Sequence, residues 1–220
     1  MFPLWLAYQA GVMFLPNVGN GADLITGHLI ALLGQSQPKY LALNACLFAA
    51  FLALVLVLRR RQRFELWLFI PVILESSVYA LTMGSLILYG MGLVGINPSL
   101  AVVAKHDLAG LGTRIALSIG AGVNEELVFR LILLTATVAL FHKVFGVRHW
   151  LALVAGFVIS AVLFSAAHHV IGGEPFHVGP FVYRIGCGLF FAALFQWRGF
   201  AVAVYTHALY DIYVMVIGWH

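Results

Sequence analysis

The sequence has 220 residues, of which 63% are hydrophobic and only 9% are charged, and its formal net charge is +4. Soluble globular domains are nearer half apolar and a quarter charged, so this composition excludes a soluble protein and a disordered chain alike. The apolar runs are continuous over about 20 residues rather than alternating in polarity, which indicates membrane helices and not barrel strands. We therefore predict an all-α polytopic bundle of about seven to eight transmembrane helices with no soluble domain.

The first part of the chain contains both short or interrupted apolar segments and apolar segments long enough to span a membrane. Residues 1–15 are apolar but short, and polar residues interrupt 22–34, so these segments are either two short elements or one broken helix. A clear span follows at 40–58, and the stretch 65–94 is long enough to tilt or to break within a bilayer. The N-terminus lacks the basic start and small-residue cleavage site of a signal peptide, so we expect the mature chain to begin at Met1.

The second part of the chain predicts a more regular series of spans. It begins with a mixed polar and apolar connection at 95–112. Four apolar segments of membrane-spanning length follow it, and we place them at 114–141, 149–170, 179–197 and 199–219. Since no hydrophilic stretch of domain size interrupts the spans, we expect a single integral membrane domain.

The short connections indicate how this bundle is oriented. Arginine resists translocation, so we predict that the arginine-rich segment 59–63 is cytoplasmic. Counting spans onward places 142–148 and Arg198 on the same side, whereas the external connection at 171–178 has no lysine or arginine. The basic residues therefore indicate orientation in a lipid bilayer rather than nucleic-acid binding. We expect an integral multi-pass protein of a prokaryotic inner membrane.

Three charged residues lie inside the predicted span at 114–141, namely Glu125, Glu126 and Arg130. A charge at the bilayer centre costs roughly 2.5–3.5 kcal/mol on insertion scales, so ionisable residues that persist there are candidates for function. Glu126 and Arg130 stand at i and i+4, share a helix face and can form an ion pair. Glu125 points about 100° away from that face and need not share Arg130, so it is the candidate general base. The alternative is a purely structural ion-pair cluster between helices.

Two further spans each carry polar groups at the same spacing. Phe164 and His168 share one helix face near the end of their span, and His168 could hold or deprotonate a water molecule together with Glu125. His207 and Asp211 also stand at i and i+4, so Asp211 could orient His207 for donation to an oxyanion. The alternative for each pair is a packing contact or a hydrogen bond between helices.

These three elements, Glu125-Glu126-x-x-x-Arg130, Phe164-x-x-x-His168 and His207-x-x-x-Asp211, resemble the ordered motifs of the CPBP intramembrane proteases. That family includes the CAAX prenyl endopeptidases of the Rce1 type and the bacteriocin-processing Abi proteins. The resemblance covers about residues 115–211. We accordingly divide the chain into N-terminal transmembrane helices at 1–100, which match no family, and a catalytic core at 101–220.

The resemblance implies an intramembrane endopeptidase that cleaves a membrane-associated or lipid-anchored protein or peptide. By motif position, Glu125 and His168 would activate the attacking water. Glu126 and Arg130 would support the site, as would Phe164. No motif in the sequence specifies an oligomeric state.

The same resemblance assigns oxyanion stabilisation to His207 and to the residue at position 211. Many members of the family have asparagine at this last position, whereas this chain has Asp211. A carboxylate donates to an oxyanion only when it is protonated. Asp211 would therefore orient His207 instead, or remain neutral in an apolar environment.

Metal dependence is a separate question, because Glu125, His168 and His207 are chemically suitable zinc ligands. The polar residues within 168–177 offer a second candidate metal site at the external interface. The chain lacks the HExxH motif, and a Glu/His pair can activate water without a metal. We therefore prefer a glutamate-type protease without a cofactor, with a zinc-dependent form of the same protease as the alternative.

Two function classes other than a protease remain open. A proton-coupled transporter would also place ionisable residues along its path, although it would more usually show repeat symmetry with paired broken helices. A membrane scaffold without enzymatic activity could keep the same residues as contacts between helices. Neither the GxSG serine motif nor the GxGD aspartyl motif occurs in the chain, which argues against the other common intramembrane proteases.

The predicted span ends place His168 near the external boundary, with Glu125 and His207 nearer the middle of the bilayer. Shared catalysis requires these groups to lie at similar depth. We therefore expect either that the helix of Glu125 begins only near 120–122 or that the helix of His168 extends beyond 170. A cavity at that depth would open toward the external face.

Overall fold

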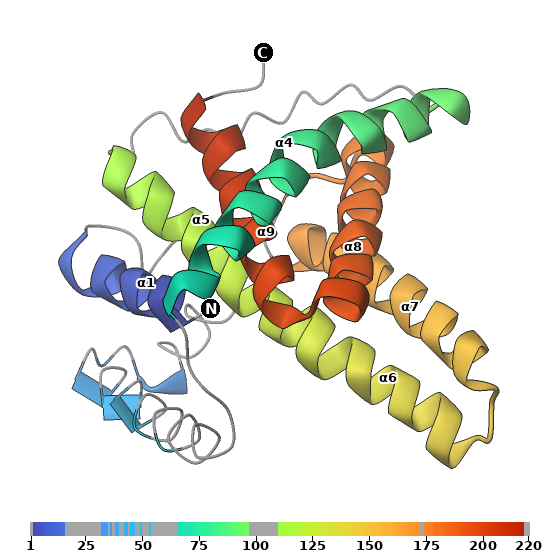
Figure 1. The fold of residues 1–220 in the computed structure, drawn as a ribbon, viewed down its shortest axis with the longest axis horizontal. Helices are drawn as coiled ribbons and strands as arrows, with labels where there is room; N and C mark the ends of the chain where they lie inside the picture. Colours follow the sequence, from blue (N-terminus) through green and yellow to red (C-terminus); the bar gives the residue numbers. More distant parts are fainter. Residues whose placement is uncertain are drawn as a thin grey trace.

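The computed structural model describes residues 2–15, 66–96, 110–171 and 174–217, together with scattered residues between 32 and 53. Within these ranges all of the regular secondary structure is helical (Figure 1). The predicted elements at 22–34 and 40–58 and the arginine-rich segment 59–63 lie outside the continuous described ranges. The predicted all-α class is confirmed for the part of the chain that the structure describes.

The helices follow one another in a simple order along the chain. The first two are α1 (Phe2–Phe14) and α4 (Phe69–Leu93). A continuous 34-residue helix, Leu111–Val144, comes next; it comprises α5 (Leu111–Glu126), a π-helical segment (Leu127–Leu134), α6 (Thr135–Ala139) and a second π-helical turn (Leu140–Val144). The last three are α7 (His149–Val170), α8 (Val178–Arg198) and α9 (Phe200–Ile212), which a π-helical turn (Tyr213–Ile217) extends.

Four of these helices are long and apolar enough to cross a membrane, and they make the chain an integral membrane protein. They are Phe69–Leu93, Leu111–Val144, His149–Val170 and Val178–Arg198. The predicted span at 199–219 is observed as the shorter apolar helix Phe200–Val216. The described residues contain six helices when Leu111–Val144 is counted as one, so the predicted total of seven to eight is not confirmed.

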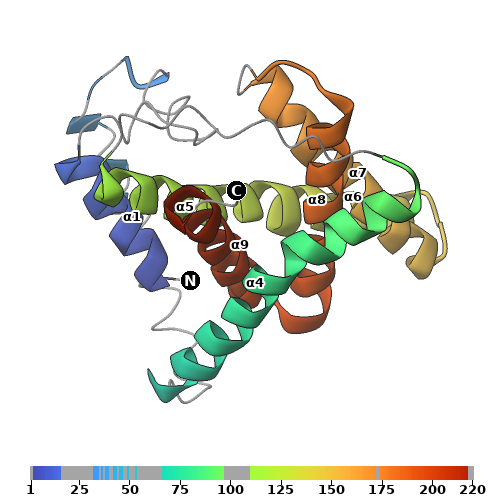
Figure 2. The same cartoon turned by 90° about the horizontal axis from the view of Figure 1, so that it is seen from above.

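Helix α9 occupies the centre of the arrangement. It packs against α4, α5 and α8, and it lies between α4 and α5 in both views (Figure 1 and Figure 2). Gly199 separates α8 from α9 and has a φ of 88°, a left-handed conformation that favours glycine. Because only this residue separates the two helices, α9 turns back against α8 and runs into the middle of the molecule.

Small residues allow the central helices to approach closely. A Cβ atom at Gly122 of α5 would lie 2.7 Å from the backbone nitrogen of Ala208 in α9 and 2.9 Å from its Cα. A Cβ atom at Gly188 of α8 would lie 2.8 Å from the Cα of Ala161 in α7. Helices in membranes associate largely through such close backbone contacts. The contact at Gly122 fixes α9 next to the segment that carries the paired glutamates.

We expect Gly122→Ala to destabilise the protein by about 1–3 kcal/mol, because the added methyl group meets backbone atoms that have no room to move aside. Thermal unfolding in detergent, monitored by circular dichroism, measures the effect. Gly92→Ala in α4 is the matched control, since a Cβ at that glycine meets nothing within 4 Å. Equal stability of the two variants would contradict the packing described for α5 and α9.

The structure also bears on the predicted topology. Arg198 at the end of α8 forms an ion pair with Glu75 near the start of α4, with Nε to Oε1 at 2.5 Å. Residues of the α6–α7 connection and Gln196 line one pocket, so that connection lies at the same end of the bundle. The predicted topology requires that the α6–α7 connection and Arg198 lie at the same end of the bundle. Its cytoplasmic orientation stays a prediction.

Candidate active site

A buried cluster of charged side chains joins the long helix to α9. The side chains of Glu126 and Arg130 are both 0% exposed, and Arg130 Nη1 lies 3.1 Å from Glu126 Oε1. The ion pair predicted from their i, i+4 spacing is therefore confirmed. The same carboxylate oxygen lies 2.8 Å from Nδ1 of His207, which donates to it. Glu126 thus links Arg130 to the imidazole of the other helix.

Aromatic rings surround the guanidinium group of Arg130. Its central carbon lies 4.5 Å from the ring centroid of Phe164 and 5.3 Å from that of Phe191, distances at which a cation is attracted to a ring face. Arg130 Nη2 also donates to the carbonyl oxygen of Gly188 at 3.3 Å. Arg130 lies in the π-helical segment that begins directly after Glu126, and such segments frequently occur at functional sites.

His207 has carboxylates beside both of its ring nitrogens. Nδ1 contacts Glu126, whereas Nε2 lies 3.5 Å from Asp211 Oδ2 and 3.8 Å from Glu125 Oε2. The ring of Phe191 stacks on the imidazole with the centroids 4.4 Å apart and the planes 13° apart. Asp211 therefore lies beside Nε2 of His207, as the i, i+4 spacing predicted, while Glu126 and the stacked ring of Phe191 hold the imidazole from its other sides.

Glu125 and Asp211 differ in their exposure. Glu125 is 3% exposed and directs its carboxylate toward His207 Nε2, as its neighbour Glu126 does toward Nδ1. The Asp211 side chain is 19% exposed, the largest value among these three carboxylates. The two carboxylates thus approach the same nitrogen of His207, and the cluster is most accessible beside Asp211.

His168 joins this cluster through an aromatic ring. Its Nδ1 donates to the carbonyl oxygen of Phe164 at 3.0 Å, so that Nε2 is left to accept a proton. The ring of Phe164 lies edge-on to His168 at 5.1 Å and to His207 at 5.9 Å. Phe164 therefore connects the two histidines in addition to contacting Arg130.

The predicted span ends placed Glu125 and His168 at different depths in the membrane. The structure brings them to a similar depth, but neither predicted change of a helix end is observed. The helix of Glu125 begins at Leu111, and α7 ends at Val170. The long helix instead extends to Val144, which places Glu125 19 residues before its end, while His168 lies 19 residues after the start of α7.

A second observation supports this shared level. The two helices are antiparallel neighbours, and the Ser160 hydroxyl donates to the Phe129 carbonyl oxygen at 2.7 Å. The rings of Phe129 and Phe164 meet edge to face with centroids 5.4 Å apart. The residues at 125 and 168 therefore lie at similar heights along the helix pair.

Some residues of the site were missed by reasoning from the sequence. Phe191 contacts both Arg130 and His207, yet nothing distinguishes it from the other phenylalanines of its span. The hydroxyl groups of Tyr183 and Tyr210 are hydrogen-bonded to one another between α8 and α9. Tyr210 directly precedes Asp211 in an apolar span. These two adjacent polar side chains could have identified Tyr210 from the sequence.

The cluster contains residue types that can bind a metal ion. Among the described residues, however, no group of three or more His, Cys, Asp or Glu side chains converges in an arrangement that could hold one. The Nδ1 atoms of His168 and His207 are engaged by a carbonyl and a carboxylate respectively, so only their Nε2 atoms remain as possible ligands. As arranged here, the donor set does not bring together the three protein ligands that a zinc site needs.

Comparison with known families agrees with the position of this cluster. Residues 108–213 match the family model described as type II CAAX prenyl endopeptidase Rce1-like. The matched residues include all of the cluster, from Glu125 to Asp211. The chain matches no curated protein and no solved structure at a significant level.

Proposed function

Residues 108–213 are an Rce1-like type II CAAX prenyl endopeptidase domain, and from this premise we propose that the chain is an intramembrane endopeptidase of the glutamate type. The family is one of proteases with membrane-associated protein substrates. The proposed reaction is hydrolysis of a peptide bond in a membrane-associated or lipid-anchored protein. The observation that carries the proposal is the buried cluster in which Glu125 and Glu126 approach the two nitrogens of His207.

In the first step, Glu125 accepts a proton from a water molecule, with His168 Nε2 helping to hold that water. A buried carboxylate next to a second acid is suited to act as a general base. The oxygen of the water then forms a bond to the carbonyl carbon of the scissile peptide. The carbonyl π electrons move to its oxygen, which becomes an oxyanion.

In the second step, His207 stabilises this oxyanion through Nε2–H. Since Nδ1 already donates to Glu126, Nε2 carries a proton only when the ring is a cation. Glu126, Asp211 and Glu125 surround the ring at 2.8, 3.5 and 3.8 Å and favour that cation. A donor fixed in a water-excluded site before the reaction is worth more than the same donor in water.

In the third step, the carboxylic acid of Glu125 returns its proton to the peptide nitrogen. The bond between carbon and nitrogen breaks, the oxyanion electrons reform the carbonyl, and the products are a carboxylic acid and an amine. Arg130 neutralises Glu126 throughout, so that Glu126 holds His207 rather than competing for the transferred proton. Arg130 is therefore a positioning residue.

We propose that Asp211 acts on the charge of His207 and does not itself donate to the oxyanion. We expect Asp211→Asn to keep cleavage within about tenfold of wild type, because the amide N–H can donate where the carboxylate cannot. Asp211→Leu has neither a charge nor a hydrogen-bond donor at this position, and it should lower kcat by about 10²–10³-fold. Steady-state cleavage of a fluorogenic membrane peptide measures both variants. Wild-type kcat in Asp211→Leu, which has no charge beside His207, would contradict this role.

Chelation separates the metal-free mechanism from its zinc-dependent alternative. We expect cleavage by the purified protein to persist after dialysis against a strong chelator, because Glu125 and His168 can activate water without a metal. The measurement is the initial rate before and after chelation, with metal content determined in the same samples. Loss of activity on chelation that zinc restores would reassign Glu125, His168 and His207 as ligands.

The proposed function as a whole is tested by reconstituting the full chain in liposomes. A panel of membrane substrates is offered, including prenylated proteins, peptide precursors and C-terminal membrane anchors, and the fragments are identified by mass spectrometry. We expect cleavage by wild type and loss of cleavage in His168→Ala. Proton flux across the same liposomes without cleavage of any substrate would favour a transporter instead.

A further inference from the structure

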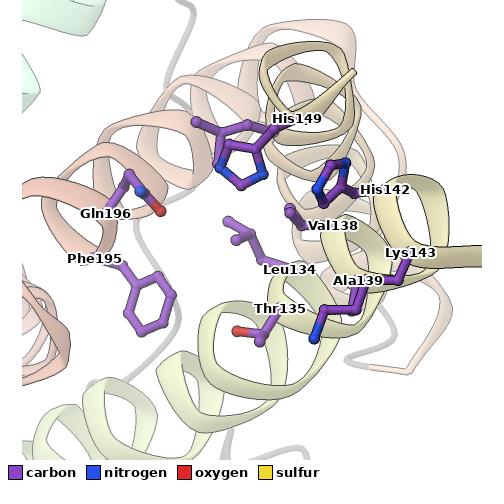
Figure 3. A pocket seen from close by; sticks show the side chains of 10 residues that line it. Leu134, Thr135, Val138, Ala139, His142, Lys143, His149, Phe195 and Gln196 are labelled. Carbon is purple, nitrogen blue, oxygen red and sulfur yellow. The ribbon is translucent and has the colours of Figure 1, made fainter. Parts of the chain in front are cut away.

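A cavity lies at the end of the bundle opposite to His168, where α6, α7 and α8 meet. Figure 3 shows its lining: the apolar side chains include Leu134, Val138 and Phe195, and a polar rim contains His142, Lys143 and His149 with Gln196 facing them across the opening. Its volume is about 250 Å³. Pockets that enclose a drug-sized ligand measure about 300–1,000 Å³, so this one accommodates part of an extended amphiphile.

The surroundings of the rim carry positive charge that nothing nearby neutralises. The sequence contains no aspartate or glutamate between Glu126 and Glu174, so α6, the π-helical turn after it and α7 are free of acids. Lys143, which lines the cavity, has no carboxylate within ion-pair distance among the described residues. Arg198 at the same end is paired with Glu75. The rim therefore attracts an anion.

The histidines of the rim have defined positions beside the opening. His142 Nδ1 donates to the carbonyl oxygen of Val147 at 2.9 Å, which fixes the ring against the α6–α7 connection, and Nε2 donates to an anion when the ring is protonated. The rings of His142 and His149 meet edge to face with their centroids 5.2 Å apart. Two imidazoles and one ammonium group thus line the same opening (Figure 3).

Aromatic side chains place this opening at the boundary between lipid and water. Phe145, Trp150 and Trp197 are 64%, 59% and 76% exposed and lie in or beside the elements that form the rim. Tryptophan, lysine and arginine gather at the headgroup level of membranes. The polar rim therefore lies at the depth of lipid headgroups, and the apolar lining lies at the depth of acyl chains.

We propose that this cavity is a binding site for an anionic phospholipid. The phosphate group would contact Lys143, His142 and His149, and the first part of one acyl chain would lie against Leu134 and Phe195. Basic pockets between transmembrane helices bind anionic headgroups in this way. The proposal does not depend on the protease assignment, because the cavity shares no residue with the cluster around His207.

Native mass spectrometry of the full chain in a nonionic detergent tests the site. Phosphatidylglycerol and phosphatidylcholine with identical acyl chains are titrated into wild type, Lys143→Ala, Ala139→Leu and Arg148→Ala. Ala139→Leu fills the cavity without changing any charge, and Arg148→Ala removes one charge from the same connection without touching the lining. Retention of phosphatidylglycerol should weaken about fivefold in Lys143→Ala, since one basic residue near a headgroup contributes about 1 kcal/mol.

The expected pattern is preferential retention of phosphatidylglycerol by wild type and by Arg148→Ala, with weaker retention by Lys143→Ala and Ala139→Leu. Equal retention of the two lipids by wild type would overturn the proposal, as would Arg148→Ala losing as much as Lys143→Ala. Glycerol phosphate is added as a soluble competitor. If glycerol phosphate binds as tightly as phosphatidylglycerol, the acyl chain contributes nothing and the cavity is a site for free phosphate instead. Lys143→Gln replaces Lys143→Ala if the alanine variant elutes as an aggregate.

Discussion

Glu125→Gln should lower kcat by about 10²–10⁴-fold, which is the contribution of a positioned general base. The amide of glutamine keeps the size and hydrogen-bonding capacity of the side chain but does not accept the proton of the attacking water. Because the change also removes a buried charge, we expect no loss of stability. Single-turnover cleavage in detergent and thermal unfolding of the same sample measure the two quantities together.

The matched control for this variant is Glu75→Gln. Glu75 is also a helical glutamate, but it pairs with Arg198 at the end of the bundle away from His168. Surface ion pairs of this kind contribute about 0–1 kcal/mol, so neither activity nor stability should change much. Equal activity of Glu125→Gln and Glu75→Gln would show that Glu125 is not the base.

Arg130→Met should lower the free energy of unfolding by about 3–5 kcal/mol, because it removes the guanidinium partner of the buried Glu126 and leaves only His207 beside that carboxylate. Methionine fills a similar volume, so the loss reflects charge and not a cavity. Arg130→Lys should recover only part of the stability, since an ammonium group lacks the planar shape that fits the ring of Phe164 and the carbonyl oxygen of Gly188. Equilibrium unfolding in mixed micelles measures each variant.

A double variant separates the structural part of this effect from the catalytic part. Glu126→Gln combined with Arg130→Met removes both charges of the buried pair, and we expect it to regain most of the lost stability. Its activity should stay low, because His207 then loses the carboxylate that holds Nδ1. A double variant as unstable as Arg130→Met would show that Arg130 stabilises the fold through its aromatic contacts alone.

The spacing of residues along single helices predicted a large part of the candidate site. The i, i+4 rule paired Glu126 with Arg130 and placed Phe164 and His168 on one face, and the structure has both contacts. These predictions succeed because they depend only on local geometry. The Glu126–Arg130 contact forms even though a π-helical segment starts between the two residues.

Contacts between helices were beyond the reach of the same reasoning. Whether Glu126 or Asp211 holds His207 depends on how α9 crosses α5, and that crossing is set by the close approach of Gly122 to Ala208. The stacking of Phe191 on His207 likewise follows from the packing of α8. The sequence contains these residues but not the angles between their helices.

The helix lengths illustrate a third limit. Hydropathy predicted a span at 114–141, whereas the helix runs from Leu111 to Val144. At 1.5 Å per residue, a helix of 34 residues is about 50 Å long and exceeds the hydrocarbon core of a bilayer. Hydropathy detects only the lipid-embedded part of such a helix. The additional turns at its ends determine the height of Glu125 relative to His168 along the helix pair.

Hydrolysis by the purified full chain in water enriched in ¹⁸O tests the central claim most directly. A membrane substrate from the panel is incubated with wild type and with Glu125→Gln, and both products are analysed by mass spectrometry. Water activation by Glu125 predicts two fragments for wild type, with one ¹⁸O atom in the new carboxyl group, and intact substrate for the variant. Cleavage without ¹⁸O, equal cleavage by both proteins, or intact substrate across the whole panel with folded wild type would contradict it.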